Sequence, residues 1–179
     1  MKEGQITQKS VVLIGFMGAG KTTIGEELAN QTGRSFIDTD QEIEKYFGMP
    51  ATEIFQSRGE EAFRQKEKEV IINYAEQQGY IISVGGGAFL QEEIKETCLS
   101  NSVVAFLDIS WPSWKERLSL LIDTRPVLQG KTMDEIQQLF EERQKIYRSS
   151  HHIEVKTDDF SPEQTAENII KQLQIETIR

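Results

Sequence analysis

Short, mostly apolar runs alternate along the chain with longer segments in which apolar residues recur at helical spacing. The runs cover residues 11–14, 35–37, 80–84, 103–109 and 153–155. Several are continuously apolar, as expected of strands buried on both faces of a sheet. We therefore predict five short strands.

The segments between the runs predict helices. Their apolar stripes include Ile24, Leu28 and Ala29; Ile43 and Phe47; Phe63, Val70, Ile71 and Tyr74; Ile136, Leu139, Phe140 and Ile146; and Ala166, Ile169, Ile170 and Leu173. The last helix opens with Ser161-Pro162-Glu163-Gln164, a capping box with proline at its first position. Strands alternating with helices indicate a single α/β domain over residues 1–179, with a parallel sheet covered on both faces. Residues 1–10 are polar and are expected to form a flexible tail.

Charge and composition narrow the possible partners. The 179 residues carry a formal net charge of −9, and no dense Lys/Arg block occurs. A nucleic-acid or membrane-surface binder needs a basic footprint, so we expect neither partner, and we expect a monomer that acts on a small molecule. Cys98 is the only cysteine and is interpreted as a small buried hydrophobe. The N-terminal segment has no apolar core and no stretch is long enough to span a membrane, so the cytoplasm is expected.

The strongest chemical signal follows the first strand. Residues 15–22 read Gly-Phe-Met-Gly-Ala-Gly-Lys-Thr and fit the phosphate-binding pattern G-x-x-x-x-G-K-[ST]. Its glycines let backbone amides approach phosphate oxygens, and the following helix adds the positive end of its dipole. In this pattern Lys21 contacts the β- and γ-phosphates of ATP and the Thr22 hydroxyl is a Mg²⁺ ligand. A strand before and an amphipathic helix after the motif supply the required context.

The motif alone does not choose among kinases, ATPases and GTPases. No Asn-Lys-x-Asp sequence is present, which counts against a GTPase. The third strand runs into Ser83, where ATPases usually carry an acid. Asp38 and Asp40, at the end of the second strand, are the replacements we expect, because open α/β sheets bind ligands at this edge. Alternate residues share a face in extended chain, so both side chains are predicted to point into the cleft. The alternative is that Thr39 or Asp40 caps a helix.

Several arginines are ambiguous when taken one at a time. Arg64 and Glu67 are one helical turn apart and could form a surface ion pair of little energetic consequence. Arg143 and Arg148 lie near a helix end, where a cation complements the helix dipole. Arg125 precedes a proline in a loop. Each could be ordinary solvated surface.

Taken together, these motifs resemble the shikimate kinase family over residues 11 to about 173. The resemblance rests on the phosphate loop, Asp38-Thr39-Asp40, Gly59-Glu60-Glu61-Ala62-Phe63-Arg64, Gly85-Gly86-Gly87, Arg125-Pro126-Val127-Leu128, and Arg143 with Tyr147-Arg148. It implies a three-layer α/β/α fold with a five-stranded parallel sheet, as in P-loop NTPases related to nucleoside-monophosphate kinases. It also implies ATP-dependent phosphorylation of the shikimate 3-hydroxyl to shikimate 3-phosphate, in chorismate and aromatic amino acid biosynthesis.

The resemblance further implies residue roles. ATP would be bound by Gly18, Ala19, Gly20, Lys21, Thr22, Thr23 and Arg125, and Mg²⁺ by Thr22 and Asp38. Shikimate would be bound by Asp40, Arg64, Gly86 and Arg143. Lys21, Asp40 and Arg125 would be catalytic. The acceptor-binding region would cover residues from about 40 to 75, and a lid would cover residues from about 118 to 132.

The sequence departs from the family in the lid, where Leu118-Ser119-Leu120-Leu121 stands at the place of a second arginine. Two other functions therefore stay open. The chain could be a P-loop kinase of another small acceptor, such as gluconate or a nucleoside monophosphate. It could also be a nucleotide-binding regulatory module without catalysis. We expect structural roles for the adjacent pair His151-His152 and for Trp111 and Trp114.

Overall fold

A single parallel sheet organises the computed structural model, which describes residues 7–121 and 126–176. Its strands are β1 Val11–Ile14, β2 Ser35–Asp38, β3 Tyr80–Ser83, β4 Val103–Asp108 and β5 Ile153–Lys156. They lie side by side in the order β2-β3-β1-β4-β5, and every pair is parallel. The carboxyl ends of β1, β2 and β3 therefore meet at one edge, where Leu13 and Asp38 both pair with Ser83.

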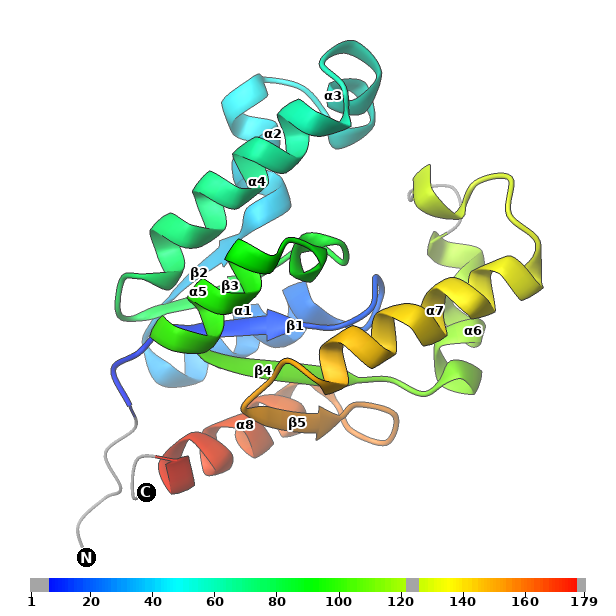
Figure 1. The fold of residues 1–179 in the computed structure, drawn as a ribbon. Helices are drawn as coiled ribbons and strands as arrows, with labels where there is room; N and C mark the ends of the chain where they lie inside the picture. Colours follow the sequence, from blue (N-terminus) through cyan, green and yellow to red (C-terminus); the bar gives the residue numbers. More distant parts are fainter. Residues whose placement is uncertain (1–6, 122–125, 177–179) are drawn as a thin grey trace, which may run out of the picture.

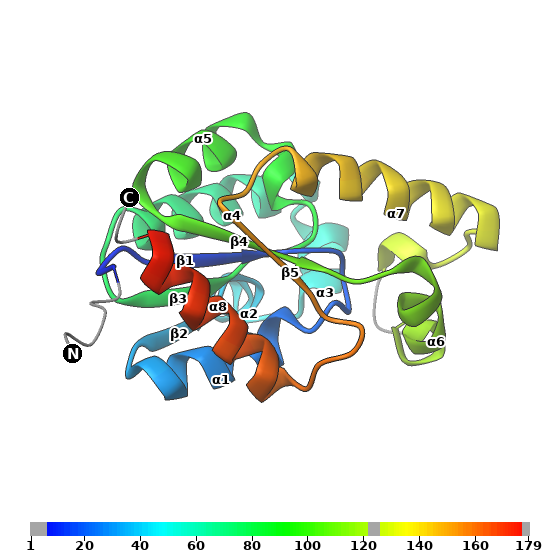
Figure 2. The same cartoon turned by 90° about the horizontal axis from the view of Figure 1, so that it is seen from below.

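Helices connect the strands and form the outer layers. They are α1 Lys21–Thr32, α2 Thr39–Phe47, α3 Ala51–Ser57, α4 Glu60–Ala75, α5 Glu92–Asn101, α6 Trp111–Leu121, α7 Met133–Arg148 and α8 Pro162–Glu176, with short 3₁₀ turns η1 Ala88–Leu90 and η2 Pro126–Leu128. Figure 2 shows α1 and α8 on one face of the sheet, and α4, α5 and α7 on the other. The three-layer α/β/α arrangement predicted by the family resemblance is confirmed.

Alternate residues of the central strands fill a separate core on each face. Val11 and Leu13 pack with α1 and α8, through residues that include Leu28 and Ile169. Val12 and Ile14 pack on the opposite face, within a larger cluster that draws on α4, α5, α6 and α7. Because β1 is apolar at every position, it can serve both cores, as its continuous pattern predicts. Burying each such side chain contributes about 1.5–3 kcal/mol.

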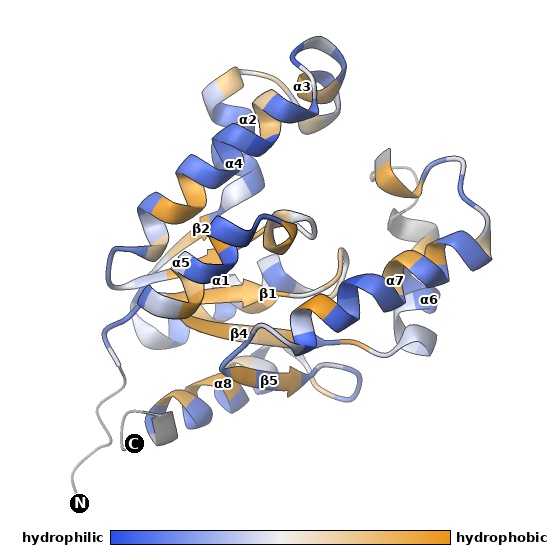
Figure 3. Ribbon diagram, viewed as in Figure 1, coloured by the Kyte–Doolittle hydropathy of each residue, from blue (hydrophilic) through white to orange (hydrophobic). Residues whose placement is uncertain are grey.

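Two arms extend beyond the carboxyl ends of the strands (Figure 1). One consists of α2, α3 and the start of α4, and has a small core of Ile43, Ile54 and Phe63. The other consists of α6, η2 and the start of α7. In Figure 3 the ribbons of both arms mix hydrophilic and hydrophobic residues, whereas the strands between them are mostly hydrophobic. This edge of the sheet is therefore flanked by two arms with little core of their own.

Strand positions agree with the sequence-based predictions to within one residue at each end. The strand β5 differs in character, because its residues alternate between buried and exposed, as suits a strand at the sheet edge. The tail predicted for residues 1–10 extends too far, since Lys9 forms a β-bridge with Gln78 and Ser10 is buried and donates to Gln77 O at 2.7 Å. No helix in the described parts of the chain is long and apolar enough to cross a membrane.

The features given structural roles by the sequence have such roles. Cys98 is buried in the larger core, and burial raises the pKa of its thiol to about 12. The Trp114 indole donates to Met17 O at 2.7 Å and stacks on Trp111. His152 accepts a hydrogen bond from Val104 N through Nδ1. The predicted capping box of α8 is present, with reciprocal bonds between Ser161 and Gln164.

Candidate active site

The phosphate loop connects the end of β1 to the start of α1. Gly20 precedes the helix with φ of 99°, in the left-handed region that a side chain disfavours. Lys21, the first helical residue, is buried, and its ammonium group donates to Gly15 O at 2.7 Å and Phe16 O at 3.1 Å. The loop thus closes around the lysine, and the backbone amides at the start of α1 form the anion-binding end of the helix.

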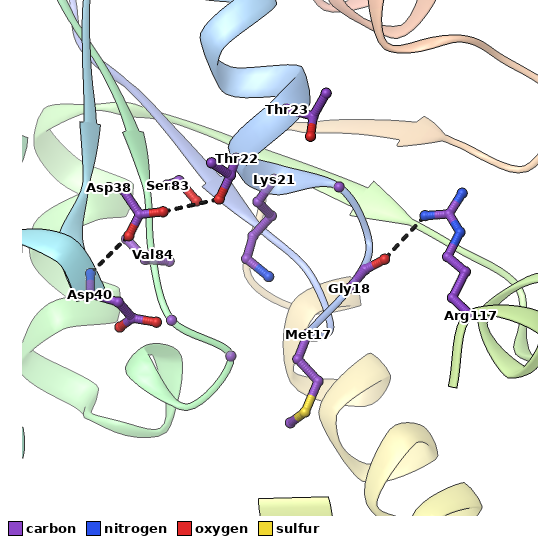
Figure 4. A pocket seen from close by; sticks show the side chains of 13 residues that line it. Met17, Gly18, Lys21, Thr22, Thr23, Asp38, Asp40, Ser83, Val84 and Arg117 are labelled. Atoms are coloured by element: carbon purple, nitrogen blue, oxygen red, sulfur yellow. Dashed lines mark hydrogen bonds between the residues drawn. The ribbon is translucent and has the colours of Figure 1, made fainter. Parts of the chain in front are cut away.

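A cavity of about 350 Å³ lies in front of this loop, at the carboxyl edge of the sheet (Figure 4). Residues of the phosphate loop, of the first turns of α1 and α2, of the ends of β2 and β3, of the glycine turn that follows β3 and of α6 line it together. They are Met17, Gly18, Gly20, Lys21, Thr22, Thr23, Asp38, Asp40, Ser83, Val84, Gly85, Gly86 and Arg117. Most of the ATP-binding and metal-binding residues predicted from the sequence are therefore brought together. Ala19 belongs to the loop but is buried, with 1% of its surface exposed, and does not line the cavity.

The two carboxylate oxygens of Asp38 have different roles: one caps a helix and the other contacts the phosphate loop residue Thr22. Its Oδ1 accepts hydrogen bonds from the backbone amides of Asp40 and Gln41, which makes Asp38 the N-cap of α2. Its Oδ2 accepts from Thr22 Oγ1 at 3.0 Å, as Figure 4 shows. The predicted alternative of a cap at Thr39 or Asp40 is wrong, because the cap is one position earlier. The cap fixes Asp38 without removing its second oxygen from the cavity.

Asp40 lines the cavity for a different reason from the one predicted. It lies in the first turn of α2, so it does not alternate with Asp38 in extended chain. The helix instead turns its carboxylate toward the glycine turn, residues 85–87. A methyl group built on Gly85 would lie 3.0 Å from Asp40 Oδ1 and 3.2 Å from Glu67 Oε2. Two carboxylates therefore approach the same glycine from α2 and α4.

Arg64 and Glu67 form an ion pair at this end of α4. Arg64 Nη1 donates to Glu67 Oε1 at 2.8 Å, and the Glu67 side chain is 1% exposed. The interpretation as a surface ion pair is therefore wrong. Burial raises the pKa of the Glu67 carboxyl, an effect that the Arg64 charge opposes. Burial also lowers the pKa of Arg64, but the Glu67 and Glu60 carboxylates outweigh it and raise that pKa overall.

The glycine turn makes room for the Arg64 guanidinium. A methyl group on Gly87 would lie 2.9 Å from Arg64 Nη2 and 3.0 Å from Nη1. The other side of the guanidinium faces the rings of Phe55 and Phe63, with centroids at 5.9 Å and 5.4 Å. Arg64 thus contacts a bare backbone and lies near two aromatic rings, beside the glycines that line the cavity. The sequence analysis assigned a role to Gly86 but missed this requirement at Gly87.

The helix α7 reaches the same turn from the opposite side. The buried Tyr147 hydroxyl donates to Gly86 O at 2.6 Å. Arg143 lies one turn earlier on α7, and its Nη1 is a buried nitrogen without a hydrogen-bond partner among the described residues. A buried guanidinium nitrogen is costly to leave unpaired, so Arg143 is suited to an anionic ligand. Arg148, by contrast, is exposed and lies 3.6 Å from Asp108.

Two arginines remain to be placed. Arg117 of α6 lines the cavity and donates to Gly18 O at 3.1 Å. The sequence analysis missed it, although it directly precedes Leu118, where a second arginine was found absent. The sequence did contain a signal for Arg117: it lies near the end of a helix that leads into the proposed lid, from where a cation can reach the phosphate loop. Arg125 lies outside the described residues.

Comparison of the sequence with known proteins relates the chain to shikimate kinases. The sequence model of the family described as shikimate kinase matches residues 17–174. The shikimate kinase of Bacillus licheniformis is 52% identical over 171 residues, which cover 95% of this chain and 96% of that protein.

Solved structures agree. A structure of shikimate kinase from Acinetobacter baumannii in complex with shikimate matches with a TM-score of 0.88 at 29% identity, covering 97% of each chain. Shikimate kinase from Aquifex aeolicus matches with a TM-score of 0.81 at 34% identity, covering 94% of this chain and 98% of that one. By sequence and by fold, the chain belongs to the shikimate kinase family, whose members are ATP-dependent kinases of a small molecule.

Proposed function

We propose that the protein transfers the γ-phosphoryl group of ATP to the 3-hydroxyl of shikimate, forming shikimate 3-phosphate for chorismate and aromatic amino acid biosynthesis. The observation that carries the proposal is the glycine turn shared by two sets of groups. Gly85 and Gly86 line the phosphate cavity, while Gly87 packs against the Arg64 guanidinium. The Arg64 cation and the phosphate loop therefore share one turn as a neighbour. A small molecule that carries both a carboxylate and a hydroxyl fits such a site.

On the nucleotide side, the triphosphate would lie along residues 18–23, with Lys21 between its β- and γ-phosphates. A Mg²⁺ ion fits the Thr22–Asp38 pair, because a hydroxyl and a carboxylate 3.0 Å apart are hard oxygen donors at the edge of the cavity. No group of three or more His, Cys, Asp or Glu that could hold a metal occurs in the described residues. This suits Mg²⁺, which usually keeps waters and substrate phosphates as its other ligands. Bound there, the ion would neutralise phosphate charge.

On the acceptor side, Arg64 and Arg143 would bind the shikimate carboxylate. A guanidinium presents paired N–H donors that match a carboxylate, and the unpartnered Nη1 of Arg143 supplies a donor in need of an acceptor. Asp40 would hold the ring hydroxyls, including the one that attacks phosphorus. Gly86, held by Tyr147, would let the ring approach the backbone.

Catalysis in this arrangement depends on position and charge. The transition state of phosphoryl transfer is loose, so little covalent chemistry is required of the protein. Lys21 would neutralise charge on the transferring group, and Asp40 would orient the hydroxyl and accept its proton. Arg125, in the proposed lid of about 118–132, would add a second cation to the transferring group held against the acceptor region of about 40–75. These roles make charge placement the main contribution of the site.

A coupled assay of ADP release tests the proposal. ADP should form from ATP and Mg²⁺ when shikimate is added, and its release without shikimate should be far slower. Phosphorus NMR of the product should show a phosphate ester on the 3-hydroxyl. ADP release with gluconate or a nucleoside monophosphate instead of shikimate would overturn the proposed acceptor, and no release with any acceptor would favour the regulatory module. The monomeric state and the cytoplasmic location stay predictions.

A further inference from the structure

We infer that Gln91 is a positioning residue of the acceptor site, because its amide fixes the Glu67 carboxylate that holds Arg64. This inference rests on the proposed function of Arg64 as an anchor of the acceptor carboxylate. Gln91 belongs to neither the phosphate cavity nor any motif that identified the family. It lies between η1 and α5, at the end of the segment that begins with the glycine turn.

The contacts of Gln91 span one turn of α4. Its Nε2 donates to Glu67 Oε1 at 2.9 Å and lies 3.3 Å from the backbone oxygen of Arg64. Both partners are acceptors, so the NH₂ end of the amide must face them, and its two hydrogens can serve one each. The same side chain thus contacts the backbone of the arginine and the carboxylate of its ion-pair partner.

Glu67 depends on this contact because its carboxylate is buried and one of its two oxygens lacks a hydrogen-bond partner among the described residues. Its Oε1 accepts two hydrogen bonds, from Arg64 Nη1 at 2.8 Å and from Gln91 Nε2 at 2.9 Å. Its Oε2 is buried without a hydrogen-bond partner among the described residues and approaches Gly85 on the side of Asp40. A carboxylate with so few partners can rotate unless both donors to Oε1 remain. Gln91 supplies the donor that is independent of the arginine.

Rotation of Glu67 would reach the ligand through Arg64. The guanidinium lies against Gly87 and the rings of Phe55 and Phe63, which restrict its plane but provide no hydrogen bond to set its direction. Direction comes from Glu67, and from Glu60 at 3.5 Å, whose side chain is 69% exposed and therefore a weak restraint. Since Gln91 fixes Glu67, it determines which N–H groups of Arg64 are available to the proposed acceptor carboxylate.

Gln91→Met tests the inference, because methionine keeps the length and apolar stem of the side chain but removes the donor. The KM for shikimate should rise about tenfold, as expected for losing part of a hydrogen bond to a charged group. The kcat and the KM for ATP should change by less than about twofold, because the phosphate loop is untouched. Gln91→Glu, which opposes Glu67 with an acceptor, should raise the KM for shikimate further.

Gln65→Met is the matched control. Gln65 lies beside Arg64 on α4, but its side chain is bonded to the exposed Glu69, so this variant should keep the wild-type KM for shikimate. In a Glu67→Gln background, Gln91→Met should have a much smaller effect than in the wild type, because the charged acceptor is gone. A purely structural role would instead lower the melting temperature and change both KM values alike.

The outcomes separate this inference from the proposed function. Wild-type protein that releases ADP with shikimate, together with a Gln91→Met variant of unchanged KM for shikimate, overturns the role of Gln91 alone. Wild-type protein that ignores shikimate overturns the proposed function, and the role of Gln91 fails with it.

Discussion

The two halves of the site are built in opposite ways. The nucleotide half is a contiguous segment, residues 15–22, whose backbone curls around Lys21 at the end of one strand. The acceptor half is assembled from α2, α4, the glycine turn and α7, so that Asp40, Arg64 and Arg143 come from distant parts of the chain. A phosphate can be held by the backbone alone, whereas a small organic acid needs side chains from several directions.

The difference extends to charge. On the nucleotide side the buried lysine is satisfied by two backbone carbonyls. On the acceptor side, the 1% exposed Glu67 and the buried Nη1 of Arg143 are charged groups with atoms that lack partners in the described structure. Such groups are costly to desolvate and are retained where a ligand completes them. Substitution of Lys21 in the nucleotide half should therefore affect turnover, and substitution of the arginines in the acceptor half should affect binding.

Lys21→Ala should have the largest effect of all. Removing a cation from the charge that develops on the transferring phosphoryl group should lower kcat by about 100-fold or more. The KM for shikimate should change little. Steady-state kinetics with Lys171→Ala, an exposed lysine on α8, provide the control. If the loss appeared mainly in the KM for shikimate, the division between the two halves would be wrong.

Arg64→Ala should have the complementary effect. Truncating one member of a buried charged contact costs about 2 kcal/mol or more, which corresponds to about a 30-fold rise in the KM for shikimate. The KM for ATP should remain near that of the wild type. Arg58→Ala removes an exposed arginine just before α4 and should leave both constants unchanged. An unchanged KM for shikimate in Arg64→Ala would remove Arg64 from the acceptor site.

The same contrast explains what the sequence could and could not predict. The phosphate loop, Thr22 and the strands around them were predictable because their signals are local. Each depends on spacing within about ten residues, on apolar runs or on glycine positions. The capping box of α8 belongs to the same class.

Features that depend on tertiary contacts were not predictable. Nothing in the spacing of Arg64 and Glu67 indicates that Glu67 is buried, since the same spacing is common on helix surfaces. Asp40 was placed in the site on an extended-chain argument, whereas it is helical because Asp38 caps α2. Arg117, Gly87 and Gln91 act across elements, and only the fold brings them to the site.

Gly87→Ala tests the acceptor half of the site at a position that carries no charge. The backbone there has φ of −99°, so alanine is not strained locally. Its methyl group would lie within 3.0 Å of both terminal nitrogens of Arg64, and must displace the guanidinium. At a cost of about 1 kcal/mol for overpacking, the KM for shikimate should rise about fivefold.

Gly86→Ala is the control for Gly87→Ala, because the neighbouring glycine has room for a methyl group. A methyl group there would meet Met17 N and Tyr147 Oη at 3.7 Å, which is ordinary contact distance. Gly86→Ala should therefore keep the melting temperature of the wild type, and any loss of shikimate binding would come from the ligand itself. A Gly87→Ala variant with wild-type KM for shikimate would show that Arg64 need not occupy this position.

The smallest expected effect concerns stability, and it is the pH dependence that Glu67→Gln should remove. Because burial raises the pKa of Glu67 in the folded protein above its ordinary value of 4.5, the folded state holds this proton to a higher pH than the unfolded chain does. The contribution of Glu67 to stability is thus complete below pH 4.5 and is lost as the pH rises through the folded-state pKa.

Glutamine does not titrate, so the free energy of unfolding of Glu67→Gln, relative to the wild type, should increase between about pH 4 and pH 8. Denaturant titrations across this range measure it, with Glu61→Gln, an exposed site on the same helix, as the control. A relative stability that falls with increasing pH would mean that the Arg64 ion pair outweighs burial, and that the acceptor half is stabilised by its charges even before a ligand arrives.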